Sequence, residues 1–549
     1  MKNTKIMLIK LFIKKGAALL AITGLAFALI VMGLFHNDSV YGYWYHSKEN
    51  SIIPGTNKTY FQAINKIAHI LDIKGKFLRS SNDLRNGKQI QLKLKQEYLD
   101  TLAIYANSKP RIKKWLPGEV FYQGKSYEIN LRLHGTHGAH YSNNEFSYTV
   151  NLRNKKSING IKRFKLIKAF QAYPHVIGIN YIAKKIGLIS QVGEIKLLSI
   201  NNSTKMAYYF VEDIKNNVIE RDFGFSKSVI IQNTKDWTRK ESDMGNSGHA
   251  SNLDLFSGHI KYKKGKYSPE AVKMFDSLCL AIKAGNSKKL LRFFDMTYMS
   301  KFLALASVFN DPHWLSGDNL KLVYRLETKK FYPIYRSETW GLELPEDKRK
   351  SAQGFKFNSF PNFNNYLFNS DEAYLDVETL MIFKTLLMNN NFRALRDVEL
   401  QKIINDKKIL INDLKLIRDS NRNVLLFDDK FRRRLFNYQV KLQNNLINST
   451  LSKADKYIHY NHIYGSINKK NQNVKIAFDA FSPVRVIFKD LLDTTIVGIE
   501  FDKNLFFENN THFFEGLGQN PKIDGFVFIN NITCDTISKN NIHINYIAD

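Results

Sequence analysis

Oxygen-bearing side chains suited to magnesium and to phosphoryl transfer gather in one short segment, residues 309–341, which reads FNDPHWLSGDNLKLVYRLETKKFYPIYRSETWG. Asp311, Asp318 and Asn319 stand there in a turn-rich stretch. Phosphoryl transfer needs an Asp that orients the acceptor hydroxyl, and Asn or Asp oxygens that hold the magnesium bridging the phosphates. The segment therefore suggests a kinase-like nucleotide site. Asp and Asn also form ordinary turns without a ligand, which is the structural alternative.

The elements around these side chains can position them. A helix-like run at 298–309 precedes them, and a strand-like run at 320–326 follows. A polar turn then leads into a second strand at 331–335. A hairpin of this kind brings Asn319 and the turn that contains Glu338 to the same end.

A second candidate element lies far upstream, where two alternating runs at 127–133 and 146–152 predict a pair of half-buried strands. The loop between them, HGTHGAHYSNN, is rich in Gly, His and Asn. Gly135 and Gly138 allow backbone amides to approach a phosphate, as in other Gly-rich loops. The sequence therefore predicts a hairpin with a permissive loop.

The three histidines of this loop, His134, His137 and His140, raise the alternative of a zinc site. Consecutive steps of three in a hairpin loop do not place three imidazoles on one face. The spacing therefore argues against zinc, and retention of zinc through purification would be the sign of a different enzyme, for instance a hydrolase that uses this loop.

Several motifs follow one another in a fixed order between residues 92 and 341. RLHG stands near the end of the first strand, and a loop with His140 and a second strand follow. INGIKRFKLIKAF, a helix with IAKKIGLIS and the strand pair GEIKLLSINNSTKMAYYFVEDI then precede the 309–341 segment. This order resembles the CotH (spore-coat protein H) kinase family, and more closely its membrane-linked bacterial relatives.

The resemblance implies an α+β, atypical protein-kinase-like two-lobe fold, with a small β-rich lobe, a helical lobe, and ATP with Mg²⁺ (or Mn²⁺) between them. By the resemblance, Asp311 lies near the catalytic Asp, and Asp318 is a competing match. Asn319 matches the Asn that such proteins place before the hairpin, where it holds metal. The nucleotide-binding residues implied are Gly135, Gly138, His140, Lys162, Lys165 and Glu212.

Two positions depart from the family pattern. Ser337 stands where relatives carry a metal-binding Asp, and Glu338 can take its place only one residue later. The second upstream strand reads Asn144-Glu145-Phe146-Ser147-Tyr148-Thr149, where relatives tend to carry Lys or Arg. Because a Ser supplies no charge to offset that of a triphosphate, a catalytically inactive, pseudokinase-like binding or assembly protein of the cell envelope is the alternative.

Residues 16–35 contain Thr23 as their only polar side chain and are long enough to cross a membrane core of about 30 Å at about 1.5 Å per residue. Five lysines precede this run, so the positive-inside rule predicts a cytoplasmic N-terminus, 1–15, and a body outside the membrane. The expectation is a single-pass signal anchor; a cleavable signal peptide is the alternative.

The formal net charge of +31, from 81 Lys and Arg against 50 Asp and Glu, bears on partners. For a body outside the membrane it favours anionic lipid headgroups or acidic envelope polymers as partners or acceptors, and the sequence shows no aromatic-interleaved basic motif for nucleic acid. The Lys-, Asn- and Ile-rich composition is a simpler explanation for part of this charge. Cys279 and Cys534 make no disulfide scaffold, although the two can pair.

Changes in pattern along the chain suggest its organisation. Short β-branched and aromatic runs after residue 473 predict a β-sandwich-like appendage. The expected parts are a basic N-terminus (1–15), the transmembrane anchor (16–35), a linker (36–57), a helical lead-in with the β-rich small lobe (58–240), a mobile loop (241–265), the helical large lobe (266–450) and the C-terminal β domain (473–549).

Overall fold

The computed structural model describes residues 88–337 with gaps at 109–111, 136–139, 141–144, 170–172, 204, 234–259, 263–267, 285–286 and 310–319. It also describes Thr23, residues 390–428, scattered positions between 382 and 455, and seven strands between Asn461 and Ile547. The chain divides into two compact units, Met1–Asp83 with Leu426–Asn445, and Leu84–Leu425 with Leu446–Asp549. All helices and strands below belong to the second unit.

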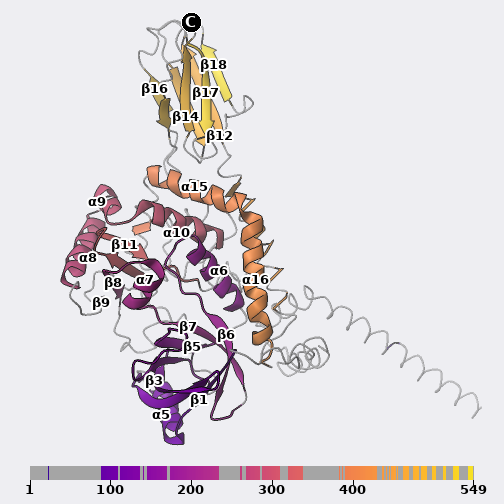
Figure 1. Ribbon diagram of the computed structural model, residues 1–549. Helices are drawn as coiled ribbons and strands as arrows, with labels where there is room; N and C mark the ends of the chain where they lie inside the picture. The colour runs from indigo at the N-terminus through magenta and orange to yellow at the C-terminus, as the bar shows by residue number, and fades with distance from the viewer. Residues whose placement is uncertain are drawn as a thin grey trace, which may run out of the picture. The chain divides into compact units, whose positions relative to one another are not determined.

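Seven strands close into a barrel in the order β1-β2-β3-β4-β5-β7-β6 (Figure 1). Parallel pairing of β1 with β6, which sets Leu92 opposite Ile200, closes the barrel, and the other neighbouring strands pair antiparallel. The strands are β1 (Gln89–Lys93), β2 (Leu116–Tyr122), β3 (Lys125–Leu133), β4 (Tyr148–Leu152), β5 (Arg163–Lys168), β6 (Glu194–Ile200) and β7 (Met206–Glu212).

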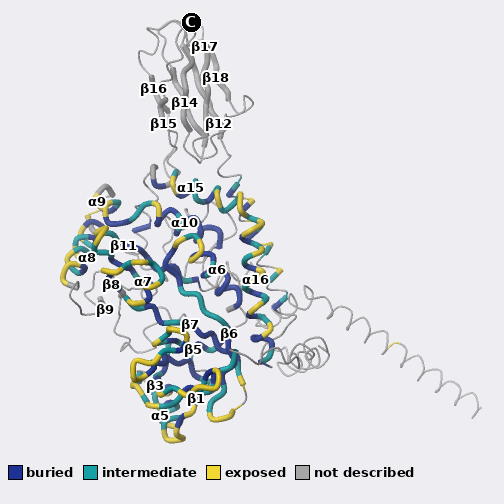
Figure 2. Tube along the Cα trace, in the orientation of Figure 1, coloured by how far each residue is buried: buried dark blue, intermediate teal, exposed yellow. Residues whose placement is uncertain are grey.

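Side chains of the barrel alternate between an apolar interior and a polar outer wall, as the period of two in a strand requires. In β3, Ile129, Leu131 and Leu133 are buried, whereas Arg132 between them is partly exposed. Helix α5 (Gln96–Asn107) packs Leu102 into the same apolar cluster. Figure 2 shows the buried strands in dark blue and the exposed connecting turns in yellow.

The predicted kinase-like two-lobe fold with a transmembrane helix is wrong for the described part of the chain, because its β-rich region is a closed barrel. Alternation of apolar and polar residues is the same in an open sheet and in a barrel, so the pattern could not separate the two. The deciding contact joins β1 to β6, about a hundred residues later. Closure removes the free edges that an open sheet would leave.

A second sheet has the order β11-β10-β8-β9. It contains the hairpin expected from the sequence, since Leu322 of β10 pairs with Pro333 of β11. Its strands are β8 (Ser228–Asn233), β9 (Ile260–Tyr262), β10 (Lys321–Arg325) and β11 (Lys330–Pro333). The helices of this region are α6 (Tyr173–Lys185), α7 (Asn216–Phe223), α8 (Ser268–Lys283), α9 (Ser287–Arg292), α10 (Met296–Phe309), α15 (Asn390–Asn405) and α16 (Lys407–Leu425).

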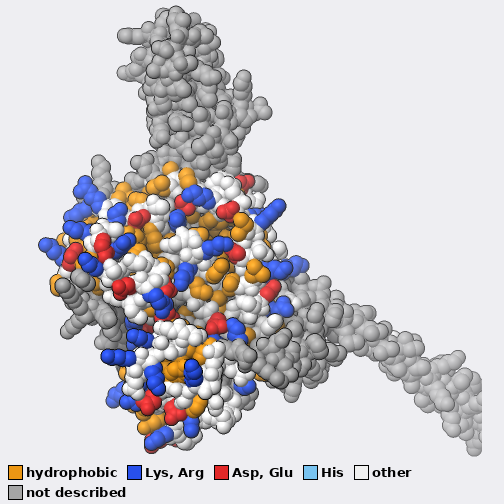
Figure 3. Space-filling model, in the orientation of Figure 1, with side chains coloured by type: hydrophobic (Ala, Val, Ile, Leu, Met, Phe, Trp, Pro, Cys, Tyr) orange, Lys and Arg blue, Asp and Glu red, His pale blue; other side chains and the backbone are white. Residues whose placement is uncertain are grey.

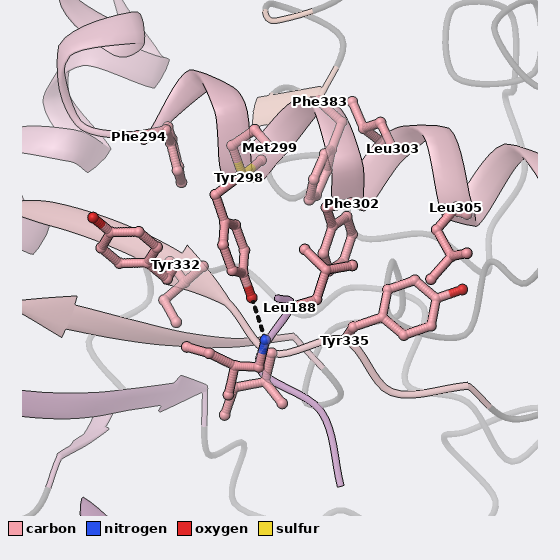
Figure 4. Packing of buried hydrophobic residues seen from close by; sticks show 14 of the residues in the cluster. Leu188, Phe294, Tyr298, Met299, Phe302, Leu303, Leu305, Tyr332, Tyr335 and Phe383 are labelled. Carbon is pink, nitrogen blue, oxygen red and sulfur yellow. Dashed lines mark hydrogen bonds between the residues drawn. The ribbon is translucent and has the colours of Figure 1, made fainter. Parts of the chain in front are cut away.

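Helix α10 is the centre of the core that packs beside this sheet. It is apolar on nearly all sides, which is typical of a buried helix. The Asp295 side chain accepts the Tyr298 N–H at 2.9 Å and so caps its first turn. Phe302 contacts Tyr335 edge to face at 5.2 Å and stacks on Phe383 at 6.0 Å between ring centroids (Figure 4).

The Tyr298 hydroxyl links three elements inside this core. It donates to the Pro333 carbonyl at the end of β11 at 2.6 Å and accepts the Ile189 N–H, in the segment between α6 and β6, at 2.9 Å. Figure 4 shows the second of these bonds, from the ring to the backbone beside Leu188. The bonds satisfy two buried backbone groups whose burial would otherwise be unfavourable.

The C-terminal strands form two small sheets, β16-β13-β12-β18 and β15-β14-β17. The first of these strands begins at Asn461, ahead of the expected start at 473. The strands are β12 (Asn461–Asn468), β13 (Val474–Ala480), β14 (Val484–Asp490), β15 (Gly498–Phe501), β16 (Thr511–Phe514), β17 (Ile523–Asn530) and β18 (Ile542–Ile547).

The predicted membrane anchor at 16–35 lies outside the described residues, except for Thr23. Among the helices that the structure describes, none is both long and apolar enough to cross a membrane. Cys534 also lies outside the described residues, so its pairing with Cys279 stays a prediction.

Removing the Tyr298 hydroxyl tests its role in the core. Tyr298→Phe leaves a buried N–H and a buried carbonyl without this partner, so the free energy of unfolding should fall by about 1–3 kcal/mol, measured by urea denaturation. The matched control is Tyr98→Phe on helix α5, where the ring is partly exposed and a change within about 0.5 kcal/mol is expected. Equal losses in the two variants would contradict the assignment.

Candidate anion-binding site

The candidate site is built around Lys165 and Asp213 on the outer wall of the barrel. Lys165 stands on β5 between two residues that point into the barrel, so its own side chain points outward. Asp213 follows β7, and its N–H donates to the Arg163 carbonyl at 3.0 Å, which holds it beside β5. Lys165 Nζ lies 3.2 Å from Asp213 Oδ1, and both side chains are nearly buried.

Two further cations contact the same carboxylate. Arg163 Nε lies 2.8 Å and Lys215 Nζ 3.4 Å from Asp213 Oδ2. The Arg163 contact is an ion pair without hydrogen-bond geometry, because the Nε–H does not point at the oxygen. Burial alone would raise the pKa of Asp213, but the charges of Lys165, Lys215 and Arg163 outweigh it and lower the pKa well below its usual value.

The direction of the pKa shift of Asp213 determines how pH affects the free energy of unfolding. An Asp whose pKa is lower in the folded state stabilises the fold above its unfolded pKa of about 3.9. That contribution is lost as the pH falls through the lowered pKa. Asp213 is therefore ionised at neutral pH and can form ion pairs with the cations around it.

Two further cations, Lys321 of the second sheet and Arg336 after β11, interact electrostatically with Lys165. Burial of its amino group, together with the charges of Lys165 and Arg336, lowers the pKa of Lys321 to about 7. Burial also lowers the pKa of Lys165, with Arg336 and Lys215 acting in the same direction and Asp213 opposing them. These mutual effects place residues from β5, β10 and the segment after β11 within electrostatic range of one another.

We refer to Arg163, Lys165, Lys215, Lys321 and Arg336, with Asp213, as the cationic cluster. It brings five basic side chains and one carboxylate together among the residues that the structure describes. Like charges in a partly dehydrated site repel each other more strongly than in water. An arrangement of this kind stabilises a bound anion, and a phosphate group has the charge and the acceptor oxygens to bind there.

The central ion pair of the cluster, Lys165 with Asp213, differs from the rest of the basic surface by its burial. Figure 3 shows Lys and Arg side chains interspersed with Asp and Glu over one face of the described part of the chain. On that face the Lys and Arg side chains are not gathered in one patch. The burial of this ion pair, together with the two further cations that share Asp213, is therefore what singles out the cluster.

A histidine network extends the polar wall beside the cluster. His134 Nδ1 shares a 3.2 Å hydrogen bond with Thr149 Oγ1, and His140 Nδ1 shares one of 3.0 Å with Ser147 Oγ, which also accepts the Lys168 N–H. The two imidazoles meet edge to face at 5.6 Å. Burial lowers the pKa of His134 well below its usual value, and the charges of Lys165 and other cations add to this effect.

Gly135 makes room for His140 at the end of β3. Its φ of +83° lies in the left-handed region, and a Cβ atom at this position would overlap the His140 ring. The glycine is therefore required by both backbone and packing. Its role in the described residues is to seat His140, and contact with a phosphate stays a prediction.

Trp115 covers part of the same wall. The Arg132 guanidinium lies 4.9 Å and that of Arg163 5.3 Å from the Trp115 ring centroid. Cation–π contacts of this kind hold a guanidinium against a flat surface. Trp115 thus restrains one of the cations that contacts Asp213.

The predicted nucleotide-binding residues do not all lie at the cationic cluster. Lys165 belongs to the cationic cluster, whereas Lys162 is exposed. Glu212 does not contact Lys165. Its Oε2 instead forms an ion pair with Arg221 Nη2 at 2.6 Å. Asp213, the next residue, holds Lys165 in its place.

The position of Asp213 beside Lys165 could have been predicted from the register of β5 and β7. Lys165 stands opposite Val211 in the β5–β7 pair, whereas Glu212 stands opposite Phe164. Since side chains alternate, the residue two positions after Val211, Asp213, shares the outer face with Lys165. No comparable pattern in the sequence points to Lys321 or Arg336. Lys321 belongs to a different sheet, and Arg336 follows β11 of that sheet.

The predicted catalytic and metal-binding residues Asp311, Asp318, Asn319 and Glu338 lie outside the described residues, as do Gly138 and His137. Ser337 is described and buried, and its N–H donates to Asn180 Oδ1 at 2.9 Å. Among the described residues no group of three or more His, Cys, Asp or Glu side chains could hold a metal ion. Magnesium at Asn319 and Glu338 therefore stays a prediction.

Comparisons with known proteins identify no relative. No protein-family model matches the chain, and no curated protein matches it significantly. The resemblance to the CotH kinase family thus rests on the quoted motifs alone and stays a hypothesis.

Substitution of Gly135 tests the seat of His140. Gly135→Ala should lower the free energy of unfolding by about 1–3 kcal/mol more than Gly124→Ala, measured by chemical denaturation. Both glycines have positive φ, but the space around Gly124 is open, so the control carries only the backbone strain. Similar losses in both variants would show that His140 moves aside freely.

Substitution of Asp213 tests the charge balance of the cluster. Asp213→Asn leaves buried cations without their carboxylate and should cost about 3–5 kcal/mol in the free energy of unfolding. Added inorganic phosphate should restore part of the loss, because it supplies the missing negative charge. The control is Asp222→Asn, whose partners Lys184 and Arg221 are more exposed than Lys165 and Arg163, with an expected cost of about 0–1 kcal/mol. A loss that phosphate does not reduce would argue against an anion site.

Proposed function

We propose that this chain binds a phosphate-bearing ligand, ATP in the first instance, at the cationic cluster, and transfers phosphate to a protein or envelope-associated acceptor. The observation that carries the proposal is that three basic side chains, Arg163, Lys165 and Lys215, surround the single carboxylate of Asp213 on the barrel wall. A polyphosphate offsets that excess charge, which a neutral substrate would leave in place.

Lys165 is the proposed phosphate-binding lysine, and Asp213 is the residue that positions it. The ion pair with Asp213 at 3.2 Å holds the ammonium group on the outer wall, where Arg163 and Lys215 share the same carboxylate. Because three cations share one carboxylate, positive charge remains for the ligand. The proposal thereby gives the positioning role to Asp213 and not to Glu212, which the resemblance implies as a nucleotide-binding residue.

The chemical step is proposed for residues outside the described part of the chain. Asp311, with Asp318 as the alternative, would orient the acceptor hydroxyl, and Asn319 and Glu338 would hold Mg²⁺ or Mn²⁺. The proposal does not depend on a kinase-like fold, because catalytic function belongs to a site and the same chemistry recurs on unrelated folds. The β-barrel is compatible with it for that reason.

A catalytically inactive binding or assembly protein of the cell envelope is the second candidate. One observation favours it: Ser337, which stands where a metal-binding Asp is expected, is buried and its backbone is bonded to Asn180. In this reading the cationic cluster binds an anion but no phosphate is transferred. An acidic envelope polymer is then as suitable an occupant as a nucleotide.

The proposed setting is a cell envelope, with a single membrane anchor at 16–35, a cytoplasmic N-terminus and an extracytoplasmic body. The acceptor proposed for this setting is a protein or an anionic polymer. Nucleic acid is not proposed as a partner, because the sequence carries no aromatic-interleaved basic motif.

The decisive experiment measures transfer of label from γ-labelled ATP by the purified full-length chain with magnesium or manganese. Transfer that falls by orders of magnitude in Lys165→Met and in Asn319→Ala, because phosphate and metal contacts are lost, would support the phosphotransferase. Lys162→Met serves as the matched control, since Lys162 is exposed and outside the cluster.

Two other outcomes separate the candidates. ATP binding without any transfer would leave the inactive binding protein as the function. Absence of both transfer and binding, the latter measured by calorimetry, would refute the proposed use of the cationic cluster.

A further inference from the structure

Helix α16 packs against helix α6 and strand β6 (Figure 1). A Cβ atom on Gly178 of α6 would come within 3.0 Å of the Leu414 side chain, so the two helices approach each other closely at this point. About two turns further along α16, Asn421 Oδ1 accepts the Ile195 N–H of β6 at 2.8 Å. The stretch of α16 between these contacts is therefore held against both α6 and β6.

Arg418 lies within this stretch and is buried, with 7 % of its surface exposed. Its Nε is buried without a hydrogen bond, and its one ion pair among the described residues joins it to Asp419 at 3.7 Å. The Asp419 side chain is 45 % exposed, so water screens its charge. His175 of α6 interacts electrostatically with Arg418, but burial lowers its pKa to about 3, so it is neutral at pH 7. The buried charge of Arg418 is thus only weakly compensated.

Arg422 stands one turn after Arg418 on the same side of α16. Its Nε is likewise buried without a hydrogen bond, although the residue as a whole is partly exposed. Within the part of the chain that the structure describes, Arg422 forms no ion pair. Burial lowers the pKa of Arg418, and the charge of Arg422 acts in the same direction. The two guanidinium groups therefore repel each other in a partly dehydrated position.

Buried polar atoms without partners are rare in native proteins, and an ion that binds between them is one explanation. A guanidinium carries five N–H donors in a plane that matches the oxygens of a phosphate or a sulfate. Two such groups one helical turn apart can donate to the same oxyanion. The negative charge of that anion would offset both the burial of Arg418 and its repulsion by Arg422.

We propose that Arg418 and Arg422 form a second anion site, at the junction of α6, α16 and β6, which binds a phosphate or sulfate group. The site shares no residue with the cationic cluster, so this inference does not rest on the proposed function. Because Arg422 is partly exposed, an anion can approach Arg418 from the surface of α16.

Equilibrium dialysis with radiolabelled orthophosphate tests the site in the full-length chain. Lys165→Met is the common background, because it removes the proposed phosphate contact at the cationic cluster. Arg418→Met should weaken phosphate binding in this background by about 10- to 100-fold, since charged hydrogen bonds are lost, and Arg422→Met should weaken it in the same direction. Lys415→Met, which removes an exposed charge from the same helix, should leave the affinity unchanged.

Melting temperatures separate a loss of binding from a loss of folding. In chloride buffer without phosphate or sulfate, Arg418→Met should melt at or above the temperature of its background, because an apolar side chain replaces a poorly compensated buried charge. Added phosphate or sulfate should raise the melting temperature of the background chain and leave that of the variant unchanged.

The results that would overturn the inference are distinct. They are an absence of phosphate binding by the background chain, an unchanged affinity in Arg418→Met, or an equal loss in Lys415→Met, which would indicate a general attraction to basic residues. A melting temperature of Arg418→Met well below that of its background in chloride would also overturn it, because Arg418 would then stabilise the fold without an anion. Phosphate transfer from ATP is measured separately, so neither proposal depends on the outcome of the other.

Competition identifies the source of the anionic group. Glycerol 3-phosphate that displaces orthophosphate as well as unlabelled phosphate does would show that the site takes the group as part of a larger molecule. Displacement by free phosphate and sulfate alone would show that the site holds a free ion.

Discussion

The parallel pairing of β1 with β6 is the contact on which the rest of the described architecture depends. It joins residues 89–92 to residues 197–200 and so turns a sheet into a barrel. Once the barrel is closed, its apolar side chains have a single interior to fill, and every second residue of β3, β4 and β5 must face outward. The outward residues include Arg132, Thr149 and Lys165, so the polar side chains of the site lie on the outer wall of the closed barrel.

The cationic cluster is an electrostatically unfavourable feature of an otherwise favourably packed fold. Its basic side chains repel one another, and three of them, Arg163, Lys165 and Lys215, share the carboxylate of Asp213. Proteins retain such unfavourable arrangements mainly where a ligand resolves them. The surrounding features are consistent with this view, because Trp115 fixes Arg163, the β10 ladder fixes Lys321, and the histidine network fixes the wall next to Lys165.

The sequence was a good guide to local structure and a poor one to closure. Alternation predicted strands at 127–133 and 146–152, and the structure has β3 at Lys125–Leu133 and β4 at Tyr148–Leu152. The apolar run at 298–309 predicted α10, which begins two residues earlier at Met296. No local pattern could show that β1 meets β6, since that pairing depends on the tertiary packing of distant segments.

The same division holds for the site. Lys165 was implied by the resemblance of its motif, INGIKRFKLIKAF, to the CotH kinase family, whereas Asp213 could have been predicted from the strand register through Val211. Lys321 and Arg336 belong to another sheet and enter the cluster only through the tertiary fold. Sequence motifs therefore do not reveal residues that reach a site from a different structural element.

The stacking of Arg132 and Arg163 on Trp115 also gives the protein an optical reporter. Indole emission responds to nearby charge and to exposure to water, and this indole lies against a guanidinium that contacts Asp213. Any ligand that draws Arg163 toward itself changes the electrostatic environment of the ring. Occupancy of the cluster can therefore be followed by fluorescence without any label, from a tryptophan that takes no part in the chemistry.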